Sequence, residues 1–186
     1  MYELILIRHG ETVFNSQERL QGGRDSPLTP RGQDEARKLG VAMAKFCGPI
    51  HAWYVSPQGR ARQTSTIIRE TAGEGRPASA PGLPEELPHE EIVEIRCGDW
   101  EGLRRSEIPA AELKRVHLST DVAYPNGESI IDVSNRCENF LSAWQASLPD
   151  SPARPDPETA DNPPAHRTVI ISHGNLLRCM GGVLSG

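Results

Sequence analysis

The hydrophobic and polar positions along the chain form short apolar runs that alternate with longer stretches of helical periodicity. Residues 3–8 are the first run, and its near-continuous apolar character predicts a strand that is buried on both faces and lies centrally in a sheet. Residues 51–56 and 168–172 predict two further strands. This alternation predicts an α/β fold of three layers, α/β/α, with a mostly parallel central sheet.

Helix signals lie between and after these strands. Thr29-Pro30 is typical of an N-cap followed by the first helical residue, and Ser56-Pro57 repeats the pattern before a helix that is expected to end near Gly73. Ser129 predicts the start of another helix, because the apolar residues after it recur on one helical face. That face consists of Ile130, Val133, Cys137, Phe140, Leu141, Trp144 and Leu148. Residues 174–184 show a last helical pattern.

Two segments have no clear periodicity. Residues 74–105 are rich in glycine, proline and charge, and they predict short strands at most. Residues 149–166 contain so many prolines that regular structure is excluded, so we expect a mobile surface loop there. Contacts to a leaving group are expected from the irregular residues 74–125, whose conformation the pattern does not predict.

Length and charge indicate a single globular domain that covers residues 1–186. A chain of 186 residues can bury a core without metals or disulfides. The net charge of −5 argues against nonspecific nucleic-acid binding. It does not exclude an anionic substrate, because a binding site responds to its local charge.

The cysteines and the N-terminal residues predict where in the cell the protein is located. Cys47, Cys97, Cys137 and Cys179 are widely separated and form no pair at metal-ligand spacing, which predicts no metal site and favours a reduced, cytoplasmic setting. The apolar run at the N-terminus is too short for a signal peptide or a membrane span. We therefore expect no membrane partner.

Polar residues follow the first and the last predicted strand directly. Arg8-His9-Gly10-Glu11 comes after residues 3–8, and His173-Gly174 comes after residues 168–172. The carboxyl ends of parallel strands meet at the edge where open α/β sheets bind ligands. A lone histidine after a strand, such as His173, more often has a structural role. Arg8 and His9 differ, because burying a cation and an imidazole together costs free energy unless an anion binds to them.

Six segments of the sequence carry a family resemblance. In chain order they are LIRHGETVFN, LQGGRDSPLTPRGQDEARKL, SPQGRARQT, EIRCGDWEGL, PNGES and ISHGN. Together they resemble the signature segments of the histidine phosphatase superfamily, which includes the cofactor-dependent phosphoglycerate mutases. The resemblance extends from residue 4 to about residue 180, and it implies a phosphoglycerate mutase-like fold.

The resemblance also implies roles for particular residues. His9 matches the nucleophile that becomes phosphohistidine, and Glu94 matches the proton donor to the leaving group. The implied phosphate ligands are Arg8, Asn15, Arg60 and His173. Further family contacts to phosphate correspond to Gln21, Gly22, Gly174 and Asn175.

These residue types suit phosphoryl transfer. A transferring phosphoryl group spreads its charge over three oxygens, so fixed cations and donors must surround it, and arginine binds two oxygens at once. Neighbouring guanidinium groups keep His9 neutral, and a carboxyl beside a phosphate dianion favours its protonated form. Gly10 is expected to let phosphate approach the backbone. Because arginines supply the positive charge, we expect neither a metal nor another cofactor.

Some assignments stay open. Glu11 could orient His9 or could cap the adjoining loop. Glu90 or Glu91 would replace Glu94 as the acid if the alignment shifted, although the GDWEG spacing argues against a shift. Family members usually continue into a further strand after the second histidine's helix, so the C-terminal edge of this chain is either truncated or lacks that element.

Three functions are compatible with these residues. The short chain and the EIRCGDWEG form favour a phosphomonoester hydrolase that acts on a small phosphorylated metabolite through a phosphohistidine. The first alternative is a cofactor-dependent phosphoglycerate mutase, and the second is a catalytically weak regulatory or binding protein. The sequence identifies neither the substrate nor the oligomeric state.

Overall fold

The computed structural model describes residues 2–78, 81–149 and 166–185. In this part of the chain, four strands form one sheet in the order β1-β4-β2-β3, and all neighbouring strands are parallel. The strands are β1 (Tyr2–Arg8), β2 (Ala52–Val55), β3 (Glu86–Pro88) and β4 (His166–Ser172). The predicted parallel sheet is therefore confirmed, with the short β3 inside the irregular region.

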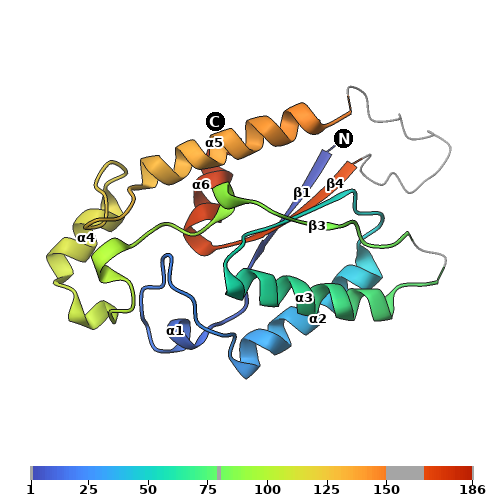
Figure 1. Cartoon of the computed structure of the whole chain (residues 1–186), viewed down its shortest axis with the longest axis horizontal. Coiled ribbons are helices and arrows are strands. Elements are labelled where there is room, and N and C mark those ends of the chain that lie inside the picture. The colour runs from blue at the N-terminus through green and yellow to red at the C-terminus, as the bar shows by residue number, and fades with distance from the viewer. Residues whose placement is uncertain (1, 79–80, 150–165, 186) are drawn as a thin grey trace.

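Helices cover both faces of the sheet, with α5 and α6 on one side and α2 and α3 on the other (Figure 1). The α-helices are α1 (Val13–Ser16), α2 (Pro30–Phe46), α3 (Gly59–Gly75), α4 (Ala110–Leu118), α5 (Ile130–Ser147) and α6 (Gly174–Ser185). Three short 3-10 helices are η1 (Glu90–Ile92), η2 (Gly98–Trp100) and η3 (Arg105–Glu107). The three-layer α/β/α prediction is confirmed.

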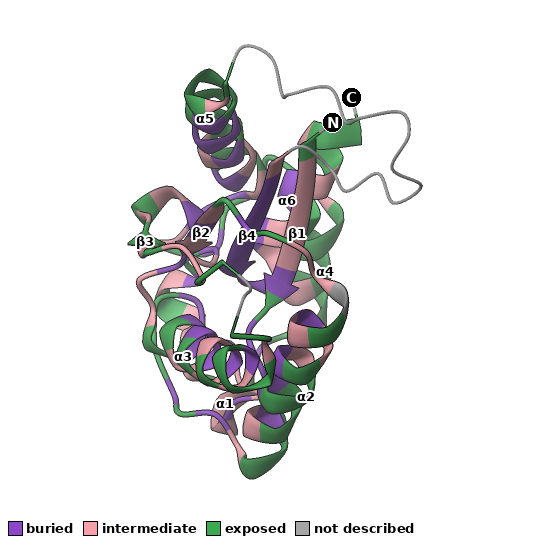
Figure 2. Cartoon of the chain, turned by 90° about the vertical axis from the view of Figure 1, so that its right-hand side faces the viewer, coloured by how far each residue is buried: buried purple, intermediate pink, exposed green. Residues whose placement is uncertain are grey.

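Strand β4, rather than β1, is the most buried strand (Figure 2). Its side chains alternate between the two layers, because Ile170 packs with α5 and α6 while Val169 and Ile171 pack with α2 and α3. The prediction of a central position for residues 3–8 is wrong, since β1 lies at the edge of the sheet. The run is apolar because helices cover both faces of the sheet. Helices can cover both faces of an edge strand as well as those of a central one.

Two of the predicted helix starts are confirmed, and one is wrong. Thr29 caps α2 by accepting from the Gly32 amide, and Ser129 caps α5 in a capping box with Asp132. Helix α3, in contrast, begins after Gln58, whose side chain makes no cap. Ser56 lies two residues before this N-cap, and its hydroxyl bonds to the second histidine, His173, and accepts from the Gln58 amide at 3.4 Å.

The remaining predictions about segments have mixed outcomes. Residues 150–165 of the expected mobile loop lie outside the described residues, and His166 already belongs to β4. Helix α3 ends at Gly75, close to the predicted end near Gly73, whereas α4 lies in a region where no helix was predicted. None of the described helices is both long and apolar enough to cross a membrane.

Candidate active site

The two histidines meet because β1 and β4 are neighbours in register. Arg8 pairs with Ser172 across the two strands, so the next residues, His9 and His173, leave the sheet side by side. Their ring centroids are 5.2 Å apart. The carboxyl edge of the sheet thus brings together two residues that are far apart in the sequence.

His9 is held in one tautomer. Its Nδ1–H donates to the Gly10 carbonyl at 2.8 Å, because a carbonyl can only accept. Burial lowers the pKa of His9 to about 4, and the charges of Arg60 and Arg8 act in the same direction. The imidazole is therefore neutral near pH 7, with the lone pair on Nε2.

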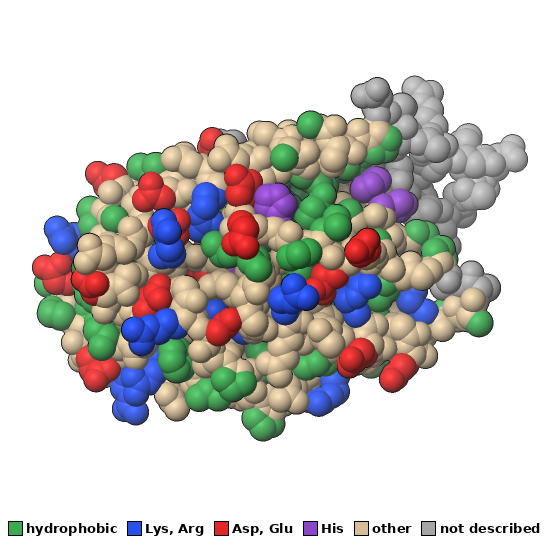
Figure 3. All heavy atoms as spheres, viewed as in Figure 1, with side chains coloured by type: hydrophobic (Ala, Val, Ile, Leu, Met, Phe, Trp, Pro, Cys, Tyr) green, Lys and Arg blue, Asp and Glu red, His purple; other side chains and the backbone are tan. Residues whose placement is uncertain are grey.

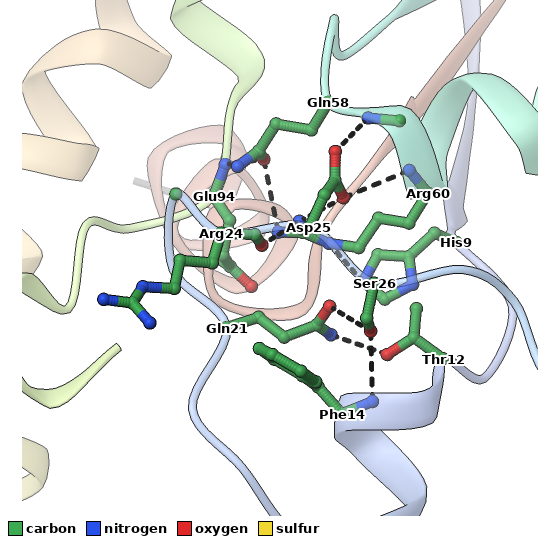
Figure 4. A network of polar contacts seen from close by, with 12 residues as sticks. His9, Thr12, Phe14, Gln21, Arg24, Asp25, Ser26, Gln58, Arg60 and Glu94 are labelled. Atoms are coloured by element: carbon green, nitrogen blue, oxygen red, sulfur yellow. Dashed lines mark hydrogen bonds and ion pairs between the residues drawn. The ribbon is translucent and has the colours of Figure 1, made fainter. Parts of the chain in front are cut away.

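Arg60, in the first turn of α3, lies beside that lone pair. Its side chain is completely buried, and every nitrogen of the guanidinium has a partner (Figure 4). Nε donates to His9 Nε2 (3.3 Å), Nη1 to the Arg24 carbonyl and Asp25 Oδ1 (both 2.9 Å), and Nη2 to the Gly22 carbonyl (3.0 Å) and Gln58 Oε1 (3.3 Å). These contacts fix the cation against the imidazole.

Asp25 is a residue of this site that the sequence reasoning missed. Besides pairing with Arg60, its carboxylate accepts from the backbone amides of Gly59 and Arg60. Asp25 thus caps α3 from a distant loop and orients the Arg60 side chain at the same time. The segment LQGGRDSPLTP contains Asp25, but no local pattern connects it to α3.

His173 is fully buried behind His9, and it is not among the residues that line the cavity. Its Nε2 is hydrogen-bonded to Ser56 Oγ at 2.7 Å, whereas its Nδ1 has no partner within the described part of the chain. Burial holds the pKa of His173 well below its usual value, and Arg60 adds to this effect. A second neutral imidazole, that of His173, therefore lies beside His9.

Glu94 lies at the N-terminus of α6. Its Oε1 accepts from the amides of Ile95 (2.9 Å) and Leu176 (3.3 Å), and its Oε2 accepts from the Asn175 amide (3.4 Å). Glu94 lines the same cavity as His9, whereas Glu90 and Glu91 do not. The geometry therefore favours Glu94 over these alternatives.

A buried ion pair supports the segment that carries Glu94. Glu128, in the PNGES segment, is 5% exposed and accepts from Arg136 Nε and Nη2 (both 3.1 Å) and from the Arg96 amide (2.9 Å). Arg136 in turn donates to the carbonyls of Glu91 (2.7 Å) and Val93 (3.3 Å). The sequence reasoning quoted PNGES as a motif without assigning a residue of it to this role.

The remaining predicted phosphate contacts divide into two groups. Arg8, Asn15, Gly174 and Asn175 line the cavity, and within the described residues the Arg8 guanidinium has no hydrogen-bond or carboxylate partner. Gln21 also lines it, but its amide is bonded to Thr12 and Ser26. The Gln21 side chain therefore holds its own loop against Thr12 and Ser26.

Two glycines are required by packing. A Cβ at Gly10 would overlap the Gly32 carbonyl of α2, so close packing against that helix requires glycine at this position. Gly22 has a φ of +54°, and a Cβ there would overlap the Glu101 carboxylate. The Gly22 carbonyl is consequently placed to accept from Arg60.

Glu11, whose role was open, anchors α2 and makes no bond to His9. Its carboxylate accepts from Thr29 Oγ1 at 2.8 Å and lies 3.6 Å from Arg31 Nη1. It therefore caps the adjoining loop, one of the two roles considered.

The site opens into a cavity of about 1020 Å³. His9, Arg8, Arg60 and Glu94 line this cavity together with residues of η3, α4 and α6 and several apolar side chains. Within the described ranges, no three His, Cys, Asp or Glu groups are arranged to hold a metal ion. The chemistry available here is that of a nucleophilic imidazole, guanidinium groups and one carboxyl.

Comparisons with known proteins show the family to which the chain belongs. The family model described as histidine phosphatase superfamily (branch 1) matches residues 4–186. Proteins named probable phosphoglycerate mutase GpmB, from Cronobacter sakazakii and from Enterobacter sp. (strain 638), are 30% and 31% identical over 100% of this chain and 76% of their own length.

Solved structures are similar over nearly the whole chain. A mycobacterial glucosyl-3-phosphoglycerate phosphatase in complex with VO3 has a TM-score of 0.77 at 26% identity, and covers 97% of this chain and 79% of its own. YhfR from Bacillus stearothermophilus has a TM-score of 0.74 at 28% identity, with 100% and 80% covered.

Proposed function

Because the chain belongs to the histidine phosphatase superfamily, we propose that it is a phosphomonoester hydrolase that acts on a small phosphorylated metabolite through a phosphohistidine at His9. The observation that carries the proposal is the neutral His9, which lines the cavity together with Glu94 and whose Nε2 lone pair accepts from Arg60 Nε.

In the first step, His9 Nε2 attacks phosphorus in line, the N–P bond forms, and the bond to the leaving oxygen breaks. The Arg60 Nε–H that binds Nε2 turns to a phosphoryl oxygen as the lone pair is used. Arg8 stabilises the remaining charge, and Glu94 gives its proton to the leaving oxygen. The Gly10 carbonyl stabilises the positive charge that develops on the ring by accepting from Nδ1–H.

In the second step, water attacks phosphohistidine while the Glu94 carboxylate takes its proton. The N–P bond breaks, inorganic phosphate leaves, and His9 returns to its neutral form. Asn15 and His173 are candidate phosphate ligands in both steps. Asn15 lines the cavity, and His173 has a buried Nδ1 without a partner among the described residues.

Rapid-quench trapping of phosphoprotein tests the nucleophile and the acid separately. His9→Ala should abolish phosphoprotein and turnover together. Glu94→Gln should still accept phosphate from 4-nitrophenyl phosphate, whose leaving group needs no proton, but should lose about 10²- to 10⁴-fold in rate with an alkyl phosphate. Phosphoprotein in His9→Ala would assign the nucleophile elsewhere.

The names of the curated relatives support a second candidate, a cofactor-dependent phosphoglycerate mutase. The similarity to the solved structure of the mycobacterial glucosyl-3-phosphoglycerate phosphatase supports hydrolysis instead. A screen of phosphorylated metabolites with and without 2,3-bisphosphoglycerate separates the two. Phosphate release that is independent of this compound indicates a hydrolase, whereas interconversion of phosphoglycerates that requires it indicates a mutase. Absence of both, and of phosphoprotein, would indicate a regulatory protein.

A cytoplasmic location belongs to the same proposal. The thiols of Cys47, Cys97, Cys137 and Cys179 are unpaired, which is usual in a reducing compartment. Cell fractionation with antibodies to the full chain tests this location.

A further inference from the structure

The side-chain amide of Gln58 links three residues of the active-site cavity. Its Oε1 accepts from the Glu94 backbone amide at 2.9 Å and from Arg60 Nη2 at 3.3 Å, and its Nε2 donates to the Gly22 carbonyl at 2.9 Å. All three partners line the cavity, whereas Gln58 does not. Gln58 therefore acts on the reaction only through these neighbours.

The partners fix the orientation of the Gln58 amide. Its oxygen meets two N–H donors and its nitrogen meets a carbonyl, so the opposite orientation would place donors against donors and oxygen against oxygen. The side chain extends from the start of α3 towards Glu94 (Figure 4). Gln58 is the N-cap residue of α3, but its side chain makes no cap, since the Asp25 carboxylate accepts the first amides of this helix. Helix capping is therefore not the role of this side chain.

The bond from Glu94 to Gln58 matters because Glu94 lies outside regular secondary structure. Residues 94–97 belong to no helix or strand. Within the described part of the chain, Gln58 Oε1 is the one acceptor of the Glu94 backbone amide. On the other side of the segment, Arg136 of α5 donates to the Val93 carbonyl at 3.3 Å. Side chains from two distant elements thus hold the backbone that carries the proposed acid.

Arg60 depends much less on Gln58 than Glu94 does. Its two Nη atoms have three other acceptors at 2.9, 2.9 and 3.0 Å, all closer than Gln58 Oε1 at 3.3 Å. Loss of the Gln58 amide would therefore leave the Arg60 cation in place but release the Glu94 backbone. Phosphoryl binding and proton donation would consequently respond differently to this loss.

Contacts on the outer surface do not hold residues in this way. On the face seen in Figure 3, acidic and basic side chains are interspersed. An exposed ion pair such as Arg115 with Glu112 lies in water, so it holds neither partner firmly. The Gln58 amide has three polar partners at once, and two of them lie 36 residues away in the chain. It therefore holds distant segments of the site in one arrangement.

We propose that Gln58 is a positioning residue that keeps the Glu94 carboxyl aligned with the leaving oxygen of a bound phosphoryl group. This inference rests on the proposed function and extends it to a side chain outside the cavity lining. A displacement of a catalytic group by about 1 Å can cost about 100-fold in rate. The Gln58 amide prevents such a displacement by joining the Glu94 backbone to Arg60 and Gly22.

Gln58→Met tests this role, because methionine is of similar length but lacks the strong donor and acceptor of the amide. Phosphoprotein formation in single turnovers isolates the first step of the reaction. With 4-nitrophenyl phosphate, whose leaving group needs no proton, the rate should fall less than about threefold, whereas with an alkyl phosphate it should fall about 10- to 100-fold. Equal losses with both substrates, or no loss with either, would overturn the proposal.

Gln63→Met is the matched control. Gln63 lies further along α3 and outside the cavity lining, and its Oε1 accepts from the Leu28 amide at 3.0 Å. The same substitution there removes one side-chain bond to a backbone amide but leaves the bond between Gln58 and Glu94 intact. The ratio of the rates with the two substrates should equal that of the unaltered protein. A ratio like that of Gln58→Met would refute a specific role of Gln58.

Hydrogen exchange of the Glu94 backbone amide separates this inference from the proposed function. The amide should exchange about 2- to 10-fold faster in Gln58→Met than in the unaltered protein or in Gln63→Met, as expected for the loss of one hydrogen bond. Unchanged exchange in a protein that forms phosphoprotein refutes the positioning role alone. Faster exchange in a protein that forms no phosphoprotein supports the hold of Gln58 on Glu94 and refutes the hydrolase.

Discussion

At His9, burial and one backbone hydrogen bond prepare the imidazole for nucleophilic attack. Burial removes the solvent that would stabilise the protonated ring, and the Gly10 carbonyl selects the tautomer with a proton on Nδ1. The resemblance implied that His9 is the nucleophile, but it did not identify the nitrogen. The structure favours Nε2, because Nδ1 is occupied by its bond to the carbonyl.

This geometry predicts a titration that NMR can follow. The pKa of His9 in the folded protein should be about 4, compared with the ordinary histidine value of 6.5. Between these values the unfolded chain binds the proton more readily, so the free energy of unfolding should decrease as the pH falls from about 6.5 to about 4. A histidine nitrogen spectrum should show Nε2 unprotonated at about pH 6.

The control for this titration is His9→Gln, which should flatten part of the pH dependence of stability, while the part due to His173 remains. A His9 midpoint near 6.5 in the folded protein would contradict the proposed electrostatics.

At the scale of elements, a distant loop decides how α3 begins. Asp25 accepts from the first amides of α3 and also pairs with Arg60, so helix capping and placement of a site residue depend on one carboxylate. The Ser56-Pro57 signature predicted a local cap. It failed because α3 begins only at Gly59, two residues later than the signature predicted, where the Asp25 carboxylate accepts the first amides.

Two substitutions separate the roles of Asp25. Asp25→Ala should lower the free energy of unfolding by about 1 kcal/mol or more through loss of the cap. Asp25→Asn should restore only part of this loss, because asparagine has one acceptor oxygen, whereas both oxygens of Asp25 accept backbone amides. Urea denaturation measures both. Asp25→Asn should nevertheless slow phosphoprotein formation, since Arg60 loses its charged partner. Equal stability of Asp25→Ala and the unaltered protein would exclude the capping role.

For the whole molecule, the contrast is between a net charge of −5 and a cavity lined by arginines. Folding brings Arg8, Arg60, Arg105 and Arg178 from β1, α3, η3 and α6 into the lining of one cavity. A metal ion in a phosphoryl-transfer site would supply the same positive charge.

Activity toward 4-nitrophenyl phosphate should therefore be unchanged after treatment with EDTA and buffer exchange. The measurement compares initial rates before treatment, after treatment, and after addition of Mg²⁺ or Zn²⁺. A complete loss that either metal restores would contradict the arginine-based mechanism.

Local signals in the sequence determined much of this protein. The apolar runs predicted β1, β2 and β4, and the caps at Thr29 and Ser129 were predicted because a cap acts within a few residues. The adjacency of His9 and His173 followed from parallel strands that end at the same edge. The family motifs indicated Arg60 and Glu94, which periodicity could not have found.

Only the tertiary structure decided the features that depend on segments distant in the sequence. Strand order placed β1 at the edge, because an apolar run reports covered faces and not hydrogen-bonding neighbours. Helix α4 was not predicted, since its inward face is completed by contacts with remote residues around Val116. The cap by Asp25 likewise requires a long-range contact, which no short-range pattern in the chain encodes.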